Sequence, residues 1–477
     1  MKRLRLVHFD IPTYGNYGDT LLFEAVRQTF EGFADGACFE VRETHPLREP
    51  VGPRLVDRIN ATADAVVVGG GGLFLSDTNP NRRSGWQWNI SIEQLRRLQV
   101  PIILFAVGNN RFYGQADFAD PFREHLALTA EKSVFFGLRN HGSVRTIREY
   151  LPPSLAERVT YQPCPTTISS ALFPDLFREE LPARRLLAAQ SIVGKRQRAA
   201  GFDPERIYRD EAQALARLAG DGWEVRSMPF ARADLGFQEV LAEAGVPTTE
   251  TRLYGRRELL FGGLRELSDV PLVLGTRGHA QMVPFGMGGV PLSLDVHPKT
   301  GYFAQDVGHP EWVLDPRADD FSDAVYRAVH EAHERHDELR ADTARVRERL
   351  LGTTLDNLAG IYRDLTGTPV TPSLRAATPR ERAVAERAYD DALRRTAAEQ
   401  RAAVARTDAE RERVERLVAR AVHEARAGDY ATARTLRRAA GVLDPAALDG
   451  SAPAWDSGAG RLVPPSVLRA ARRLRGR

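Results

Sequence analysis

Cysteine is scarce in this chain of 477 residues, which contains two, Cys38 and Cys164. They stand far apart, and neither belongs to a CxxC motif or to a cysteine–histidine spacing of the kind that binds zinc. The sequence therefore argues against a disulfide framework and a structural zinc site, and it fits a reducing cytoplasm. We predict no metal site and no bound cofactor.

Long apolar runs are also lacking. No stretch reaches the roughly 18 apolar residues of a membrane-spanning helix, and the basic start of the chain has no apolar segment of the kind found in secretory signals. The content of 43% hydrophobic and 27% charged residues is typical of globular domains with a core. We expect a cytoplasmic protein.

The chain has little net charge, because 66 basic residues nearly balance 63 acidic ones to leave +3. This balance does not indicate a nucleic-acid partner. Lysine is rare as well, since arginine supplies almost all of the positive charge. The lysines are Lys2, Lys132, Lys195 and Lys299.

Two α/β domains are predicted, since a single core rarely exceeds roughly 250–300 residues. In both halves, short apolar strands alternate with helical patterns, as in parallel sheets. In the first half we expect strands at 4–9, 65–68, 102–107 and 134–138 and helices near 20–30 and 92–98. In the second half we expect strands at 185–191, 224–228, 271–274, 291–294 and 312–314 and helices near 210–218 and 236–244.

Composition also suggests where the domains end. The expected parts are a first domain at 1–178, a second domain with closing helices at 179–365, a linker at 366–380, a helical appendage at 381–445 and a flexible basic tail at 446–477. The appendage is rich in Ala, Arg and Glu, which suits exposed helices. It is either a plain solvated helix or a surface for contact with a protein or the periphery of a membrane. The oligomeric state stays open.

Glycine-rich turns follow two of the expected strands. In Gly15-Asn16-Tyr17-Gly18-Asp19, glycines allow close approach of the backbone to a ligand or acceptor, and the start of the next helix can hold an anion. Asp19 either caps that helix or acts on a substrate hydroxyl, and Asn16 tolerates a left-handed turn. Gly69, Gly70 and Gly71 indicate a second close approach without identifying a cofactor.

Cationic and titratable side chains follow other strands. Arg111 and Arg139 come after the third and fourth strands, and Arg139 is the stronger candidate because it follows a buried strand directly. Arg277 and His279 follow the strand at 271–274, and Lys299 lies in the expected loop after the next strand. A fixed cation, an imidazole and an ammonium suit an anionic substrate that undergoes proton transfer.

Taken together, the GNYGD turn, Val68-Gly69-Gly70-Gly71, Gly137-Leu138-Arg139, Thr276-Arg277-Gly278-His279 and Val290-Pro291 with Lys299 resemble the polysaccharide pyruvyl transferase family. The resemblance spans roughly residues 5–310. It implies two Rossmann-like domains in a GT-B-like arrangement, to which this chain adds the C-terminal helical appendage. After the third strand, Asn109-Asn110 replaces the smaller, glycine-rich turn expected in the family.

The resemblance also implies an activity, the transfer of pyruvate from phosphoenolpyruvate to hydroxyls of a sugar in a glycan or glycolipid precursor, forming a ketal. On this reading Arg277, Lys299 and Arg139 bind the donor, His279 is the general acid or base, and Asp19 and Asn16 orient the acceptor. Phosphoenolpyruvate is then a donor substrate and not a cofactor. The alternatives are a GT-B-type glycosyltransferase that uses a nucleotide sugar and a non-enzymatic binding protein on the same fold.

Overall fold

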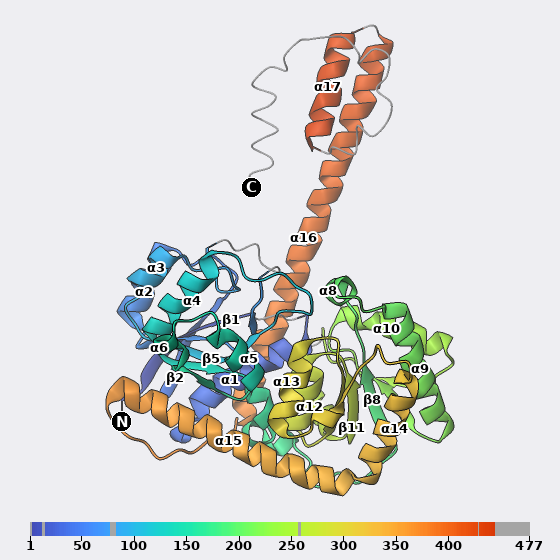
Figure 1. The fold of residues 1–477 in the computed structure, drawn as a ribbon. Helices are drawn as coiled ribbons and strands as arrows, with labels where there is room; N and C mark the ends of the chain where they lie inside the picture. The colour runs from blue at the N-terminus through green and yellow to red at the C-terminus, as the bar shows by residue number, and fades with distance from the viewer. Residues whose placement is uncertain (1, 12–14, 77–82, 256–258, 428, 444–477) are drawn as a thin grey trace. The chain divides into compact units, whose positions relative to one another are not determined.

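The computed structural model describes residues 2–11, 15–76, 83–255, 259–427 and 429–443 (Figure 1). The chain divides into two compact units, Met1–Asp390 and Asp391–Arg477. The first unit contains two parallel sheets, each in its own α/β domain.

The sheet of the first domain has, within the described residues, seven strands in the order β2-β1-β3-β5-β6-β7, with β4 paired to β5. All of its pairings are parallel. The strands are β1 (Leu4–Asp10), β2 (Phe39–Pro46), β3 (Ala65–Val68), β4 (Gly71–Phe74), β5 (Ile102–Asn109), β6 (Ser133–Leu138) and β7 (Val159–Tyr161). The helices are α1 (Tyr17–Gly32), α2 (Pro53–Thr62), α3 (Ile92–Arg97), α4 (Pro121–Lys132), α5 (His141–Arg148), α6 (Pro153–Ala156) and α7 (Ser169–Leu172).

The sheet of the second domain is also parallel throughout, with its described strands in the order β10-β9-β8-β11-β12-β13. These are β8 (Leu186–Gln190), β9 (Glu224–Ser227), β10 (Thr248–Glu250), β11 (Leu272–Gly275), β12 (Val290–Leu294) and β13 (Val313–Leu314). The helices are α8 (Lys195–Ala199), α9 (Pro204–Gly220), α10 (Leu235–Glu243), α11 (Leu259–Ser268), α12 (Gly278–Gly286), α13 (Pro298–Val307) and α14 (Phe321–Glu334).

Both sheets reverse their strand order next to the first strand of the domain, between β1 and β3 and between β8 and β11. The chain connections that follow two such neighbouring strands run to opposite sides. A crevice therefore opens between them at the carboxyl ends of the strands. The central strands are apolar because helices cover both faces of the sheet. In β3 and β5 every residue is buried.

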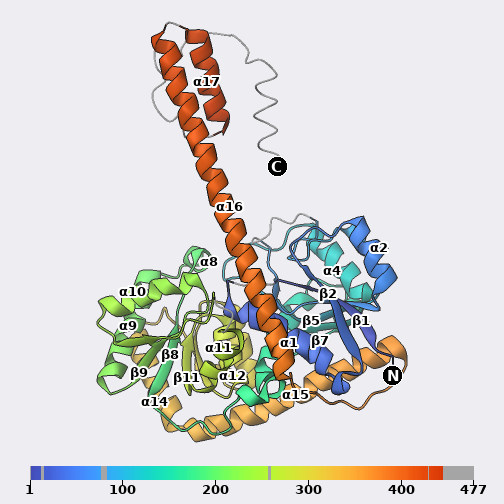
Figure 2. The ribbon, with the colours of Figure 1, turned by 180° about the vertical axis from the view of Figure 1, so that it is seen from behind.

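Helix α15 (His336–Thr366) contacts both domains, as Figures 1 and 2 show. Arg347 donates to the Phe285 carbonyl of the second domain at 3.3 Å. In the first domain, Asn357 donates to the Tyr161 carbonyl at 3.0 Å and the Tyr362 hydroxyl donates to the Lys2 carbonyl at 2.8 Å. One helix of 31 residues therefore holds the two domains from one side.

The predicted fold class is confirmed: two Rossmann-like domains in a GT-B-like arrangement, followed by C-terminal helices. The expected strands are all present, within one or two residues at each end. The prediction missed β2 and β10, which are polar edge strands, and β4, which begins with two glycines. It also missed the three-residue β7. None of these four has the apolar run by which a buried strand is recognised.

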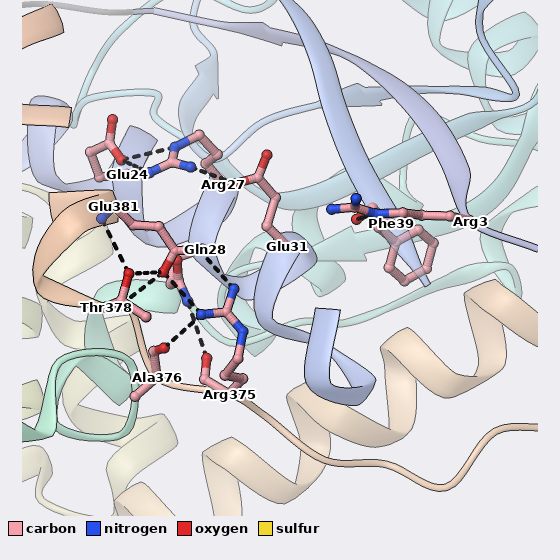
Figure 3. Close-up of polar contacts among 10 residues, drawn as sticks. All are labelled: Arg3, Glu24, Arg27, Gln28, Glu31, Phe39, Arg375, Ala376, Thr378 and Glu381. Carbon is pink, nitrogen blue, oxygen red and sulfur yellow. Dashed lines mark hydrogen bonds and ion pairs between the residues drawn. The ribbon is translucent and has the colours of Figure 1, made fainter. Parts of the chain in front are cut away.

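The chain reaches α16 (Pro379–Arg426) through a segment that is fixed to α1 (Figure 3). Arg375 donates its backbone amide to the Gly32 carbonyl at 2.9 Å, and its own carbonyl accepts from Gln28 at 3.1 Å. At the start of α16, Thr378 and Glu381 form reciprocal hydrogen bonds of 2.7 and 3.2 Å, a capping box. Glu381 also binds the Arg375 guanidinium at 2.8 and 2.9 Å.

A second helix, α17 (Tyr430–Leu443), follows α16. The tail expected at 446–477 lies outside the described residues, and the domain boundaries drawn from composition stay predictions. Among the helices that the structure describes, none is both long and apolar enough to cross a membrane.

We predict that Glu381→Ala lowers the free energy of local unfolding at the start of α16 by about 2 kcal/mol. The substitution removes a capping interaction and a charge-assisted hydrogen-bonded pair. The hydrogen bonds from Arg375, with those from Thr378, lower the pKa of Glu381 to about 2. The stabilisation is thus present above about pH 4.5 and is lost as the pH falls toward 2.

Amide hydrogen exchange over residues 378–390 measures this change. Glu412→Ala is the matched control, since Glu412 forms an exposed pair with Arg416 at 3.3 Å further along the same helix and its loss should have little effect. Equal exchange in the two variants would contradict the prediction.

Candidate functional site

A cavity of about 230 Å³ lies at the carboxyl ends of both sheets, where both domains contribute its walls. It opens at the strand-order reversals, the place where parallel α/β sheets bind ligands. The first domain contributes Asp10, Asn16, Asp19, Arg48, Gly70, Gly71, Gly72, Asn110 and Arg139, and the second contributes Arg277, Gly278, His279 and Lys299, among others.

His279 and Asp19 face each other across the two domains. The Nδ1 atom of His279 lies 3.4 Å from a carboxylate oxygen of Asp19, and His279 is 8% exposed. Burial alone would lower the pKa of His279, but Asp19 and the Cys164 thiol together outweigh it, so the pKa lies above its ordinary value. The Nε2 atom of His279 is buried and has no hydrogen-bond partner within the described residues. Asp19 therefore orients the imidazole through Nδ1, and the Cys164 thiol interacts with the ring as well.

The GNYGD turn makes this approach of the two domains possible. A Cβ atom on Gly18 would lie 2.3 Å from the Cβ of His279, so only glycine leaves room for the imidazole. The helix cap is Asn16, whose side chain accepts from the Gly18 amide at 3.2 Å, so of the two roles left open for Asp19 the capping role belongs to Asn16. Asn16 has an extended backbone, with φ of −130°, and not the left-handed turn that we expected. Asp19 accepts from the Asn16 side chain at 2.8 Å.

Arg277 is held by Asp234, a residue that the sequence analysis did not single out. The guanidinium donates to the Asp234 carboxylate at 2.5 and 2.9 Å, and Asp234 is buried. Asp234 also accepts the backbone amides of Phe230 and Ala231 at 2.9 and 3.1 Å. The charge of Arg277 is therefore largely balanced before any ligand binds.

Arg139 differs, because it is 5% exposed and has no carboxylate partner among the described residues. Its Nε atom has no hydrogen-bond partner within the described residues. Burial lowers the pKa of Arg139, although a guanidinium remains charged. A Cβ atom on Gly108 would lie 2.2 Å from this Nε, so the glycine before Asn109 makes room for the buried cation.

Lys299 lies in the first turn of α13 and not in the loop that we expected. His297 caps this helix by accepting from the Lys299 amide at 3.1 Å, a role that its flanking sequence does not reveal. The Lys299 ammonium donates to the amide oxygen of Asn110 at 3.2 Å. Burial and the nearby Arg139 lower the pKa of Lys299 to about 7.

The remaining predicted site residues lie in different places. Gly70 and Gly71 line the cavity, whereas Gly15, Gly18 and Gly69 do not. At Gly69 a Cβ atom would lie 2.2 Å from the Phe105 carbonyl, so the reason for glycine there is strand packing. Arg111 binds Asp117 and the Tyr150 hydroxyl at 3.1 and 2.8 Å and is not among the lining residues.

Three polar or charged side chains that line the cavity were not among the predicted site residues, namely Asp10, Arg48 and Asn110. Asn110 was seen as a departure from the turn expected after the third strand, although its position at the carboxyl end of that strand was a usable signal. Asp10 ends the first strand and carried the same signal. Arg48 follows an edge strand that was not predicted.

A family model for polysaccharide pyruvyl transferases matches residues 16–298. The chain belongs to this family. The family domain makes it a transferase, and the matched range includes Asp19, Arg139, Arg277 and His279. Asp10 precedes the matched range and Lys299 follows it directly.

Solved structures with a similar course of the chain have low sequence identity. A Thermobaculum terrenum O-GlcNAc transferase mutant is 13% identical, with 82% of this chain and 69% of that chain covered and a TM-score of 0.44. A putative UDP-N-acetylglucosamine 2-epimerase from Listeria monocytogenes is 11% identical, with 79% of this chain and 100% of that chain covered and a TM-score of 0.48. A glycosyltransferase from Rickettsia africae is 7% identical, with 76% of this chain and 99% of that chain covered and a TM-score of 0.48. No curated protein matches the sequence.

We predict that Gly18→Ala displaces His279 and lowers the stability of the protein by about 1–3 kcal/mol, the usual effect of forcing a methyl group into a filled space. Thermal unfolding measures the change. Gly236→Ala in α10 is the control, because a Cβ atom there meets nothing within 4 Å and alanine favours a helix. A Gly18 variant as stable as this control would show that the close contact with His279 is absent in solution.

Proposed function

We propose that the cavity binds phosphoenolpyruvate and that the protein transfers its pyruvyl group to hydroxyls of a sugar in a glycan or glycolipid precursor, forming a ketal. The observation that carries the proposal is the buried guanidinium of Arg139, which lines the cavity without a carboxylate partner among the described residues. An unpaired buried charge is strongly unfavourable unless a ligand of opposite charge completes it. The site is therefore built for an anion.

The donor has two anionic groups, a carboxylate and a phosphate, joined through one carbon atom. Arg139 offers a planar fork that matches a carboxylate, and Lys299 offers a compact charge that suits a phosphate. The first turn of α12 has no side-chain cap and begins at Gly278 in the cavity wall, so its amides are a further anion-binding group. Asp234 already balances the positive charge of Arg277. The contribution of Arg277 is therefore to orient the donor through hydrogen bonds more than to supply net charge.

His279 is placed to handle the proton. Its raised pKa favours the imidazolium, and Asp19 holds the ring through Nδ1, which leaves Nε2 for the substrate. We assign to His279 the proton that the donor methylene must gain. Asp19 then stabilises the imidazolium and, with Asn16, lies where an acceptor hydroxyl can be oriented.

The reaction balances without a further reactant. The oxygen of one acceptor hydroxyl bonds to C2 of the donor while C3 gains a proton from His279, so the methylene becomes a methyl group. The hydroxyl loses its own proton as the O–C2 bond forms, and this proton returns to His279. The oxygen of a second hydroxyl then displaces phosphate from C2, and its proton leaves with the phosphate. The products are the pyruvate ketal and inorganic phosphate.

A nucleotide-sugar glycosyltransferase has less support from the second domain. The side-chain oxygen of Gln190 accepts the backbone amides of Thr276 and Arg277 at 3.3 and 3.1 Å. These are amides at the strand-order reversal that a diphosphate would otherwise use. The cavity of about 230 Å³ is also smaller than the roughly 300–1,000 Å³ usual for larger ligands. The cytoplasmic location and a role of the C-terminal helices in binding a partner stay predictions.

We predict that Arg139→Ala weakens phosphoenolpyruvate binding at least about a hundredfold, because a hydrogen-bonded charge pair contributes about 3 kcal/mol. The ligand-free variant should be as stable as the wild type or more so, since it no longer buries an unpaired charge. Thermal stabilisation by phosphoenolpyruvate and by UDP measures both effects.

Arg111→Ala is the matched control, because Arg111 follows the neighbouring strand but points to Asp117. Stabilisation of the wild type and the control by phosphoenolpyruvate, with none for Arg139→Ala, supports the donor site. Stabilisation by UDP alone would replace the proposal by glycosyl transfer.

We further predict that His279→Gln keeps phosphoenolpyruvate binding and lowers turnover by about 10²–10⁴, the usual contribution of a general acid. Phosphate release from phosphoenolpyruvate in the presence of a panel of glycosides with neighbouring free hydroxyls measures turnover. Turnover equal to that of the wild type would remove His279 from the proton transfer.

A further inference from the structure

Asp10 is a buried carboxyl group in the cavity wall that the reaction described above does not use. It ends β1, is 3% exposed and lines the cavity. One of its oxygens, Oδ1, accepts from the Ile11 amide at 2.6 Å. The other, Oδ2, is buried and has no hydrogen-bond partner within the described residues.

The neighbouring imidazole does not supply the missing partner. The Nε2 atom of His8 lies 3.7 Å from Oδ2 of Asp10 and is hydrogen-bonded to the Gly69 carbonyl. A carbonyl only accepts, so Nε2 carries the proton and gives it to Gly69. Burial lowers the pKa of His8 to about 4, so the ring is neutral near neutral pH and offers Asp10 no positive charge.

The other charges around the cavity do not favour an ionised Asp10 either. Burial and the negative charge of Asp19 raise the pKa of Asp10 well above its ordinary value, against the opposing effect of the Ile11 amide. Arg277 is bound to Asp234, and Arg48 donates its Nε to Gln87 at 2.7 Å. Two carboxyl groups in one pocket, one paired with an imidazole and one unpaired, commonly differ in protonation.

We propose that Asp10 is a further donor-binding residue that acts as a neutral carboxylic acid, with Oδ2–H donating a hydrogen bond to an anionic oxygen of phosphoenolpyruvate. This inference rests on the proposed function, because it takes phosphoenolpyruvate as the ligand. It explains how a carboxyl group lines a cavity built for an anion. An ionised Asp10 would repel the donor, whereas a protonated one can donate a hydrogen bond to it.

The test is the affinity for phosphoenolpyruvate, measured by isothermal titration calorimetry near neutral pH. Asp10→Asn keeps a hydrogen-bond donor of the same shape and should bind within about threefold of the wild type. Asp10→Ala has no donor and should bind about tenfold more weakly or worse, the effect of losing one hydrogen bond to a charged group. Asp57→Asn on α2 is the control, because it removes an exposed carboxylate that pairs with Arg97 at 2.8 Å.

Two results would overturn the assignment. Wild-type affinity in Asp10→Ala would show that Asp10 makes no bond to the donor, and tighter binding in both Asp10 variants would show that the native group is ionised. A wild type that fails to bind phosphoenolpyruvate while all variants remain folded would instead overturn the proposed function, so the two failures are distinct.

An infrared difference spectrum of the wild type against Asp10→Asn tests the protonation directly and does not require Asp10→Ala to fold. A protonated-carboxyl C=O band that disappears in Asp10→Asn is expected. Absence of such a band in the wild type would overturn the proposal. The spectrum should be taken at a pH where the nearby groups that also carry or change charge are constant, namely His8, Asp19, Arg48, Arg139, Arg277, His279 and Lys299.

Discussion

The arrangement of the site depends on Asp234, which joins one domain to the other. Its carboxylate holds Arg277 and the amides of Phe230 and Ala231. The Phe230 carbonyl in turn accepts the Tyr17 amide of the first domain at 2.9 Å. One buried charge therefore fixes the start of α1 against the second domain. The first turn of α1 carries Asp19. The distance between Asp19 and His279 therefore depends on this contact between Asp234, Phe230 and Tyr17.

The pairing of Asp234 with Arg277 also explains how the cavity stays positively charged. Because Asp234 lies behind Arg277, outside the cavity wall, it balances one cation without placing a carboxylate beside the others. Arg139 and Lys299 are left to a ligand, and burial together with the charge of Arg139 lowers the pKa of Lys299 to about 7. Proteins tolerate such unfavourable charge in a functional site when the rest of the fold is stable enough to hold it.

Sequence reasoning succeeded where a residue sits in a local pattern. Apolar strands followed by glycine or a charged residue indicated the fold, and they placed Arg139 at the carboxyl ends of the first sheet and Arg277 and His279 at those of the second. It failed for residues whose role depends on a distant partner. Asp234 looks like any acidic residue before a helix, and the need for glycine at Gly18 comes from His279, which is 261 positions away and in the other domain. Lys299 was placed in a loop because the helix cap is a histidine, which is not a common capping residue.

The segment after α15 belongs physically to the first domain, although it lies beyond the family match. Helix α1 begins at the cavity with Asn16 and Asp19 and ends at Gly32, where a Cβ atom would lie 2.5 Å from the Arg375 carbonyl. A cut near residue 370 would remove this contact together with the start of α16 and so disturb the helix that carries Asp19. The compact unit extends to Asp390. A truncation meant to isolate the role of the C-terminal helices should therefore end after residue 390, so that a loss of activity reports on those helices and not on α1.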